Sequence, residues 1–568
     1  MQRYLPYPVL LFLILWIGLM LVGRGSLFAD PGVFWHTVLG DGVLNGLQLT
    51  THDTFSYTYA GQPWLSLQWL AEWAMAAAHA WGGWDTLLLA TVTLLAAFYA
   101  WVGARLARCG LHPILATAVV MVTIAASSHH FHARPHLGSI LFLGLAFGLL
   151  CDVEAGRVRP ARLIWLVPLF VVWTNVHGGV LAGLASLDLV VGGWTTWHIA
   201  RAVCRRRDWL VDDAAFPTPL TTPRQMLIAW LVVAGCAAAL LLNPYGPAMI
   251  EAWLAILRMP LTGLIVEHRA LNIATPVGFV TASLGLAYLV LLVDTFRHRG
   301  WQHVRATWLL PVVWMLLAWS RVRHGPLFAA VGAIALAELL PYSRLAAWLA
   351  QFELFTPPSS ETSRARNATT NQSPEPDNRT TVFKTAAWRA GVIPVCLIAF
   401  ALTLQHLRVP VPVVGANWAR IDEARWPVAL LPELKELEAE AIARRDVALA
   451  AGLPVTAVPL RLFNALDYGG FLIYYTPCLK TFIDDRCELY GTEFLSRYVE
   501  AEQGRGHWLY NWDRQYGFDA ALVHAGSPLD RYLAHAPGWQ LVRRAGSGAL
   551  YRRGSDAVPP NHVTQWRE

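Results

Sequence analysis

Charged residues are scarce in this chain of 568 residues, in which Asp, Glu, Lys and Arg together account for only 14%. Hydrophobic residues account for 55% and the mean hydropathy is +0.40, a composition that excludes an ordinary soluble globular protein. Glycine-rich phosphate loops, heptad tracts and internal repeats are also absent, which excludes P-loop nucleotide binding, coiled coils and repeat arrays. Cysteine is sparse, and five of the seven lie in or beside hydrophobic runs, where cysteine acts as a small hydrophobe.

Hydrophobic runs of bilayer length fill most of the chain and predict a polytopic α-helical membrane protein with about eleven transmembrane helices. The first run has a long apolar core and is followed by a poor cleavage site, which favours an uncleaved anchor over a signal peptide. The predicted spans are residues 5–23, 84–104, 112–128, 137–151, 162–174, 178–199, 226–242, 277–294, 306–319, 326–341 and 388–404.

Arginine and lysine residues concentrate in alternate loops, and the positive-inside rule places those loops and the N-terminus in the cytoplasm. The net charge of +6 is therefore a topology signal, and no nucleic-acid partner is predicted. Polar segments at 30–73, 129–136, 173–179, 243–246 and 320–324 all fall on the outer face. Their common side predicts a single functional site at the outer surface of the membrane.

Residues 62–82 are rich in tryptophan and also contain Gln68 and Glu72, a pattern typical of an amphipathic helix at the membrane interface. A spanning helix is the alternative. It would move the basic loop at 151–162 to the outside, which the charge rule disfavours.

Residues 1–341 form the predicted multi-span domain, with an external loop at 24–83. The polar, Pro/Ser/Thr-rich composition of 342–387 predicts a disordered cytoplasmic linker before the last span at 388–404. In residues 405–568, β-like runs alternate with helical stretches, which predicts an extracytoplasmic α/β domain.

The β-like runs of this domain include GFLIYYT, and the helical stretches lie near 431–450, 491–503 and 528–536. Cys478 and Cys487 are its only cysteines. An oxidising compartment would permit a disulfide between them, and free thiols are the alternative.

Asp30 follows the first span, where a carboxylate near the membrane surface is a candidate functional group. One interpretation is a helix N-cap, because Pro31 follows it. The other is a general base that takes a proton from an acceptor hydroxyl. The two roles are compatible, since a cap also fixes the position of the carboxylate.

Cations gather on the same predicted face. Arg134 lies within a histidine-rich segment that includes His136, and Arg321 and Arg323 lie near a later helix end. A guanidinium at a bundle mouth suits a phosphate group, whereas snorkelling to lipid headgroups is the alternative. The histidine spacing resembles a metal site, but Pro135 disturbs the helix and no Cys or carboxylate completes a ligand set, so no metal site is predicted.

Other polar residues are candidates for holding an acceptor or shaping the site. Turn formation, helix termination and ion pairing explain many of them equally well, as for Asp53 in an Asx-type turn. These candidates are His36, Asp53, Glu72, Asn175, His177, Asn243, Tyr245, Glu267, His268, Asn464, Asp467, Asp484 and Arg486.

The motifs DPGVFWHTVLGDGVL, HDTFSYTYAGQPW, ARPHL, WTNVHGG, NPYG, RVRHGPLF and RLFNALDYGGFLIYY together resemble a bacterial family of polytopic, glycosyltransferase-like proteins of the GT-C superfamily. This family is similar to the RgtA/B/C/D-type and ArnT-type lipid-linked sugar transferases, and the resemblance covers most of 28–340 and 458–552. Such enzymes carry an acidic catalytic residue in the first external loop, where Asp30 stands. The resembling sequences often read Asp-Pro-Asp, whereas Gly32 is the third residue here. This departure favours a mechanism with one carboxylate base and no cofactor. A requirement for a divalent metal ion is the alternative.

The resemblance implies an inverting glycosyltransferase of hexosyl or pentosyl type in the bacterial cytoplasmic membrane. Its partners would be a polyprenyl-phosphate sugar donor, membrane lipid, and a glycan, lipid or protein acceptor. Asp30 would act as the base, and Arg134, Arg321, Arg323 and His136 would bind the donor phosphate. Two alternatives are a transporter of lipid-linked glycans and a non-catalytic subunit of an envelope assembly complex.

Overall fold

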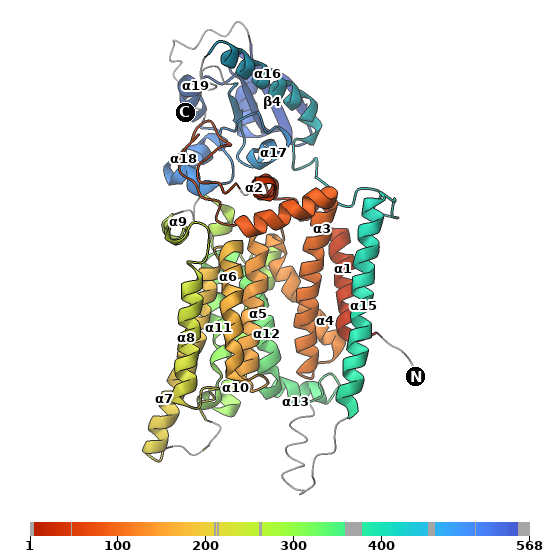
Figure 1. Ribbon diagram of the computed structural model, residues 1–568, viewed down its shortest axis with the longest axis vertical. Helices are drawn as coiled ribbons and strands as arrows, with labels where there is room; N and C mark the ends of the chain where they lie inside the picture. The colour runs from red at the N-terminus through yellow and green to blue at the C-terminus, as the bar shows by residue number, and fades with distance from the viewer. Residues whose placement is uncertain are drawn as a thin grey trace.

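The computed structural model describes residues 5–46, 48–209, 212, 215–260, 264–357, 378–452, 460–505 and 507–554. A bundle of long helices carries a smaller domain of helices and strands on one of its ends (Figure 1). The first external loop lies between these two parts. This arrangement confirms a mostly helical protein with a C-terminal domain that contains a small sheet.

Within the described ranges, seven helical segments are long and apolar enough to cross a membrane, judged by length and composition. They are built on α1 (Tyr7–Ser26), α3 (Trp69–Arg108), α4 (Pro113–Ser127), α5 (His136–Glu154), α7 (Val180–Arg206), α10 (Pro276–Arg299) and α12 (Gly325–Leu339). Shorter apolar helices lie at α6 (Leu166–Val176), α8 (Pro223–Ala239), α11 (Leu310–Ser320) and the second half of α15 (Asn378–His406). Each predicted hydrophobic run falls on one of these helices, and the number of spans stays a prediction.

Local sequence signals begin several of these helices. Thr222 accepts a hydrogen bond from the backbone N–H of Gln225 in a capping box at the start of α8, and Thr275 accepts one from Gly278 at the start of α10. Proline occupies the first turn of both helices, where its missing N–H costs nothing. Short 3-10 helices connect the longer ones: η1 (Ser128–His130), η2 (Pro160–Trp165), η3 (Val266–His268), η4 (Trp301–His303), η5 (Ala306–Trp308), η6 (Val322–His324) and η7 (Leu340–Tyr342).

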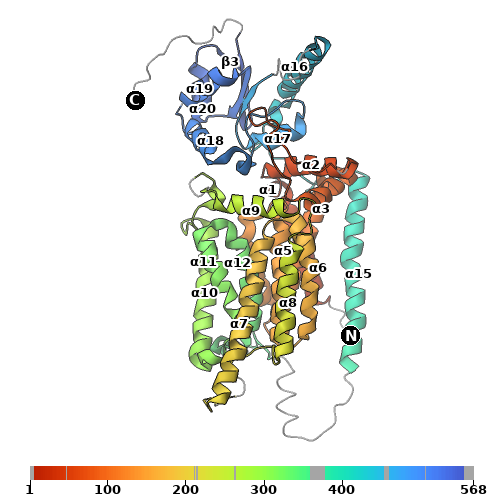
Figure 2. The ribbon, with the colours of Figure 1, turned by 60° about the vertical axis from the view of Figure 1, so that its left-hand side comes forward.

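Helix α3 contains a sharp break. Gly82 and Gly83 have non-helical backbone angles, and the φ of 67° at Gly83 lies in the left-handed region that glycine tolerates. Before the break the helix lies across the end of the bundle beside α2 (Gly32–Gly46), and after it the helix runs into the bundle (Figure 1). Helix α9 (Pro247–Arg258) also lies across this end (Figure 2).

The C-terminal domain is built on a four-stranded sheet with the order β1-β2-β4-β3. Strand β1 (Leu462–Asn464) pairs in parallel with β2 (Ala520–His524), and β4 (Gly548–Arg553) pairs antiparallel with both β2 and β3 (Trp539–Ala545). The helices of this domain are α16 (Leu431–Ala450), preceded by η8 (Val428–Leu430), α17 (Tyr468–Tyr475), α18 (Cys487–Glu502), α19 (His507–Tyr516) and α20 (Pro528–His535).

At three places the structure departs from a sequence-based expectation or decides between two alternatives. The run GFLIYYT belongs to helix α17 rather than to a strand, because burial against the first external loop overrides the β-propensity of its aromatic residues. The expected linker at 342–387 contains α13 (Arg344–Ala350) and the start of α15; its residues 358–377 lie outside the described ones. Cys478 and Cys487 are free thiols, since the first lies on an exposed turn and the second at the start of α18 beside the cavity described below.

Aromatic packing fixes the C-terminal domain on the first external loop. The buried ring of Phe34 on α2 makes edge contacts with Trp84, Trp426 and Phe471, at centroid distances of 5.5, 5.0 and 5.7 Å. A Cβ atom at Gly470 would lie 2.2 Å from the carbonyl oxygen of Pro31, so α17 touches the backbone beside Asp30. The domain therefore forms part of the framework that holds this loop.

We expect Gly470→Ala to weaken the packing of the C-terminal domain against the first external loop, because the added methyl group cannot fit against Pro31. Overpacking of this kind costs about 1–3 kcal/mol. Thermal unfolding of the purified protein in detergent measures the effect, and limited proteolysis locates it. Gly192→Ala on α7 is the matched control, since nothing lies within 4 Å of that position, and equal melting temperatures for the two variants would contradict the prediction.

Candidate functional site

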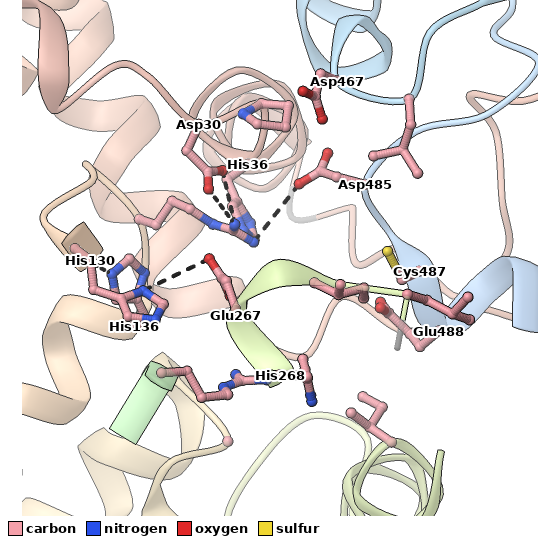
Figure 3. A pocket seen from close by; sticks show the side chains of 18 of the residues that line it. Asp30, His36, His130, His136, Glu267, His268, Asp467, Asp485, Cys487 and Glu488 are labelled. Atoms are coloured by element: carbon pink, nitrogen blue, oxygen red, sulfur yellow. Dashed lines mark hydrogen bonds and ion pairs between the residues drawn. The ribbon is translucent and has the colours of Figure 1, made fainter. Parts of the chain in front are cut away.

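A cavity of about 1060 Å³ lies where the bundle end, the first external loop and the C-terminal domain meet (Figure 3). Its walls combine charged side chains with apolar ones that include Leu181, Ile256 and Leu327. The predicted site residues that line it are Asp30, His36, Glu72, Arg134, His136, His177, Glu267, His268, Arg321, Arg323 and Asp467. The tertiary structure thus gathers polar residues from six separate regions of the sequence around one space.

The centre of this site is an ion pair between Asp30 and Arg134. Nη1 of Arg134 lies 2.8 Å from Oδ1 and 2.9 Å from Oδ2 of Asp30. Nη2 of the same arginine lies 3.9 Å from Oδ2 of Asp485 in the C-terminal domain. One guanidinium therefore links two carboxylates that are 455 positions apart in the sequence.

The backbone around Asp30 is held from several sides. Oδ1 of Asp30 accepts a hydrogen bond from the N–H of Gly32, as the expected capping role requires. The carbonyl of Leu27 accepts the N–H of Ala133, and the carbonyl of Phe28 accepts Nε1 of Trp426. The carboxylate is therefore both a local cap and a wall of the cavity.

Gly32 has a steric role that its sequence position does not reveal. A Cβ atom there would lie 2.6 Å from Nε and 2.7 Å from Cζ of Arg134. Any side chain at this position would push the guanidinium away from Asp30. The Asp-Pro-Gly sequence of this chain therefore matches the observed ion pair, and an Asp-Pro-Asp sequence would not.

The two carboxyl groups beside Arg134 differ in acidity. Burial alone would raise the pKa of Asp30, but Arg134, His132 and the Gly32 N–H outweigh it, and the pKa of Asp30 is lowered. Burial, together with the negative charges of Asp30 and Asp484, raises the pKa of Asp485 well above the usual carboxyl range. The geometry thus favours an ionised Asp30 and a protonated Asp485, whose Oδ2 has no hydrogen-bond partner among the described residues.

Further cations line the side of the cavity nearer the bundle. Arg321 and Arg323 both face it, and Nη1 of Arg323 donates to Nε2 of His268 at 2.7 Å. Nε2 of His136 donates to the carbonyl oxygen of His130 at 2.6 Å. These guanidinium groups, with Arg134, can bind an anionic group such as a phosphate.

Seven other predicted residues lie outside the cavity walls and serve the framework. Arg486 is fully buried between Asp53 and Asp484, with Nη2 at 2.7 Å from an oxygen of each. Asn175 accepts Nε1 of Trp69 at 2.7 Å. The remaining ones make backbone contacts: Asn243 at the turn before α9, Tyr245 to the carbonyl of Thr50, and Asn464 to the carbonyl of Ile483.

Asp484, Asp485 and Arg486 in TFIDDRC are adjacent polar residues that the sequence offers equally as ligand contacts, and Asp485 is the one that lines the cavity. Asp484 and Arg486 pair with each other and are structural. Nε1 of Trp35 donates to Oδ1 of Asp485 at 2.8 Å and aims this carboxyl at Arg134. No sequence pattern separates the adjacent Asp484 and Asp485, because their opposite directions depend on the local turn before α18.

Within the described residues, no group of three or more His, Cys, Asp or Glu side chains is placed to hold a metal ion. His129, His132 and His136, which could have shared a helix face, are separated by the end of η1 and the start of α5. The expectation that the protein uses no cofactor stays a prediction.

Anion binding in this cavity should weaken as pH rises, because ionisation of Asp485 adds a negative charge beside Arg134. The raised pKa of Asp485 places this change above the usual carboxyl range. Binding of inorganic sulfate, whose charge is constant over this range, can be followed by calorimetry from about pH 5 to pH 9. Asp485→Asn should remove most of the pH dependence, and an unchanged profile in that variant would refute this assignment.

Comparisons with known proteins support the fold. No family model and no curated protein sequence matches this chain. Among solved structures, the apo oligosaccharyltransferase of Archaeoglobus fulgidus matches with a TM-score of 0.51 and 11% identity, covering 92% of this chain and 70% of that one.

Two further structures of oligosaccharyltransferase from the same organism match with a TM-score of 0.49. The one with an inhibitory peptide and a dolichol-phosphate is 11% identical over 98% of this chain and 75% of that one. The one tethered to an acceptor peptide is 12% identical over 92% and 69%. At this identity the similarity to the first structure shows the fold alone, and membership of the GT-C superfamily and of its RgtA-type or ArnT-type members stays a prediction.

Proposed function

We propose that this protein is a membrane glycosyltransferase that transfers a sugar from a polyprenyl-phosphate-linked donor to an acceptor at the outer face of the bacterial cytoplasmic membrane. The observation that carries this proposal is the Asp30–Arg134 ion pair in the wall of a large, mixed polar and apolar cavity. Asp30 supplies a fixed carboxylate, and Arg134 supplies donors for a phosphate. The GT-C-like fold supports the same assignment.

The two ends of the cavity match the two ends of such a donor. Apolar side chains from α7, α9 and α12, including Leu181, Ile256 and Leu327, lie on the bundle side and suit a polyprenyl chain. Arg134, Arg321 and Arg323 line the same cavity and would bind the phosphate of the donor. The C-terminal domain closes the opposite side with Asp467 and Asp485, facing the space for an acceptor.

In the proposed reaction, the donor phosphate draws Arg134 away from Asp30. The released carboxylate then accepts the proton of the acceptor hydroxyl while that oxygen attacks the anomeric carbon from the face opposite the phosphate. The new carbon–oxygen bond forms as the bond from the anomeric carbon to the phosphate oxygen breaks, with inversion. The electron pair leaves with the phosphate, whose charge Arg134 and Arg323 stabilise. No cofactor takes part in this scheme.

Electrostatics explains why the ion pair suits this task. While it is paired with Asp30, Arg134 lowers the pKa of that carboxyl group, which makes the carboxylate a weak base. When a phosphate takes over the guanidinium, that stabilisation of the charged form is lost and the basicity of Asp30 rises. The donor therefore activates the base, and the acceptor reacts only after the donor has bound.

Asp30→Asn should reduce sugar transfer by about 100-fold or more, because the amide cannot accept the proton. The measurement is transfer of radiolabelled sugar from a polyprenyl-phosphate donor in membranes with normal levels of the protein. Asp41→Asn, an exposed position on the same helix α2 and outside the cavity, is the matched control and should keep full activity. Full activity of Asp30→Asn would sink the proposal, and donor flipping without transfer in liposomes would favour a transporter.

Arg134→Lys should raise the donor KM by about tenfold or more, because an ammonium cannot span two phosphate oxygens as the guanidinium does. Initial rates over a range of donor concentrations measure this effect. The exposed Arg420→Lys is the control. A donor KM that equals that of the wild type would mean that another cation binds the phosphate.

A further inference from the structure

One buried nitrogen in the cavity has no partner and no role in the scheme above. His36 lies on α2, about one helical turn beyond Gly32, and its side chain is completely buried. Its Nδ1 lies 2.8 Å from Oε1 of Glu72. Its Nε2 has no hydrogen-bond partner among the described residues. A buried polar atom in this state calls for a ligand or another explanation.

Neighbouring groups determine what His36 can offer to such a ligand. Oε2 of Glu72 accepts the hydroxyl of Ser66, and Oε1 lies at hydrogen-bond distance from Nδ1 of His36, so this carboxyl group holds the ring in place. A carboxylate accepts from Nδ1–H and a carboxylic acid donates to Nδ1, and in both cases Nε2 is the ring nitrogen left for a ligand. The indole of Trp35 lies against the imidazole at a centroid distance of 3.6 Å and restricts its rotation.

The imidazole is also neutral. Burial lowers the pKa of His36 well below its usual value, and the positive charge of Arg134 lowers it further, followed by the charges of His177 and His136. One of the two ring nitrogens therefore carries a lone pair at physiological pH and the other carries a proton. A hydroxyl group both donates and accepts, so it satisfies Nε2 in either tautomer, whereas an ionised phosphate satisfies only Nε2–H.

Other histidines of the cavity do not duplicate this arrangement. Nε2 of His268 accepts a hydrogen bond from Arg323, which leaves Nδ1–H of that ring as a donor. Nδ1 of His130 lies 3.8 Å from Glu267, beyond hydrogen-bond distance, so no carboxylate fixes its tautomer. Among the described cavity residues with an orphaned ring nitrogen, His36 is the one with a carboxylate hydrogen-bonded to its other nitrogen.

We propose that Nε2 of His36 contacts the substrate and forms a hydrogen bond with one of its hydroxyl groups, with Glu72 and Ser66 as positioning residues. His36 (Figure 3) lines the same cavity as Arg134, so the hydroxyl belongs to a molecule whose phosphate Arg134 binds, or to one that reacts with it. The substrate class is thus a hydroxyl-bearing sugar phosphate, or its hydroxyl-bearing acceptor. This proposal rests on the proposed function and adds a specificity residue to it.

The test compares His36→Phe with the wild type. Phenylalanine keeps the flat ring beside Trp35 and removes both ring nitrogens. The probes are farnesyl phosphate and farnesyl phosphates that carry glucose, galactose or mannose, with affinities measured by calorimetry in detergent. His52→Phe, an exposed position in the same external loop and outside the cavity, is the matched control.

If the hydroxyl belongs to the sugar, His36→Phe should weaken binding of a hexosyl probe by about tenfold and leave farnesyl phosphate unchanged. If it belongs to the acceptor, probe binding should stay equal and transfer should fall by about tenfold or more. Glu72→Gln, which keeps a polar partner for Nδ1, should lose less binding or transfer than Glu72→Leu. This graded rescue distinguishes positioning from a general loss of folding, which thermal unfolding of each variant monitors.

Two results would overturn the proposal. One is binding and transfer by His36→Phe that match those of the wild type. The other is an equal loss of binding for farnesyl phosphate and its hexosyl forms. Hexosyl-selective binding that depends on His36 without any transfer by the wild type would refute the glycosyltransferase assignment alone. Normal transfer by the wild type and by His36→Phe would refute the role of His36 alone.

Discussion

The ion pair between Asp30 and Arg134 is the interaction on which the organisation of this site depends. It joins the segment after α1 to the segment before α5, and through its second nitrogen the guanidinium approaches Asp485 in the C-terminal domain. A buried carboxylate and a buried guanidinium are each costly alone, so each requires the other. The pair also sets the acidity of Asp30, because removing the cation would let burial raise its pKa.

A rigid framework keeps this pair in place. Phe34 is packed among Trp84, Trp426 and Phe471, while Arg486 joins the first external loop to the C-terminal domain through Asp53. These contacts lie outside the cavity walls, yet they fix the two segments that carry Asp30 and Asp485. Sites held on such supported elements keep their geometry better than sites on free loops. Much of the polar sequence around the site is therefore framework rather than reaction chemistry.

The polarity of the cavity is divided between groups that donate and groups that accept. Arg134, Arg321 and Arg323 offer only N–H donors, which suits an anion. Asp30 offers acceptors, and the neutral ring of His36 offers a free nitrogen, both of which suit hydroxyl groups. A sugar phosphate presents both kinds of group within one molecule. The apolar side chains on the bundle side suit the lipid chain of the proposed donor.

The sequence by itself determined the class of protein and the face on which its chemistry lies. Membrane insertion of a hydrophobic run and the side on which an arginine-rich loop lies depend on the local sequence alone. These patterns therefore predicted the helical bundle and the small α/β domain. They also predicted that Asp30, Arg134 and Arg323 lie on one face. Only the tertiary structure decided which of the neighbouring Asp484 and Asp485 enters the cavity, and that GFLIYYT forms a helix. These outcomes depend on contacts between residues hundreds of positions apart, such as Gly470 against Pro31, and no local pattern records them. The role of Gly32 is also visible only in the folded chain, where Arg134 occupies the space that a side chain at this position would need.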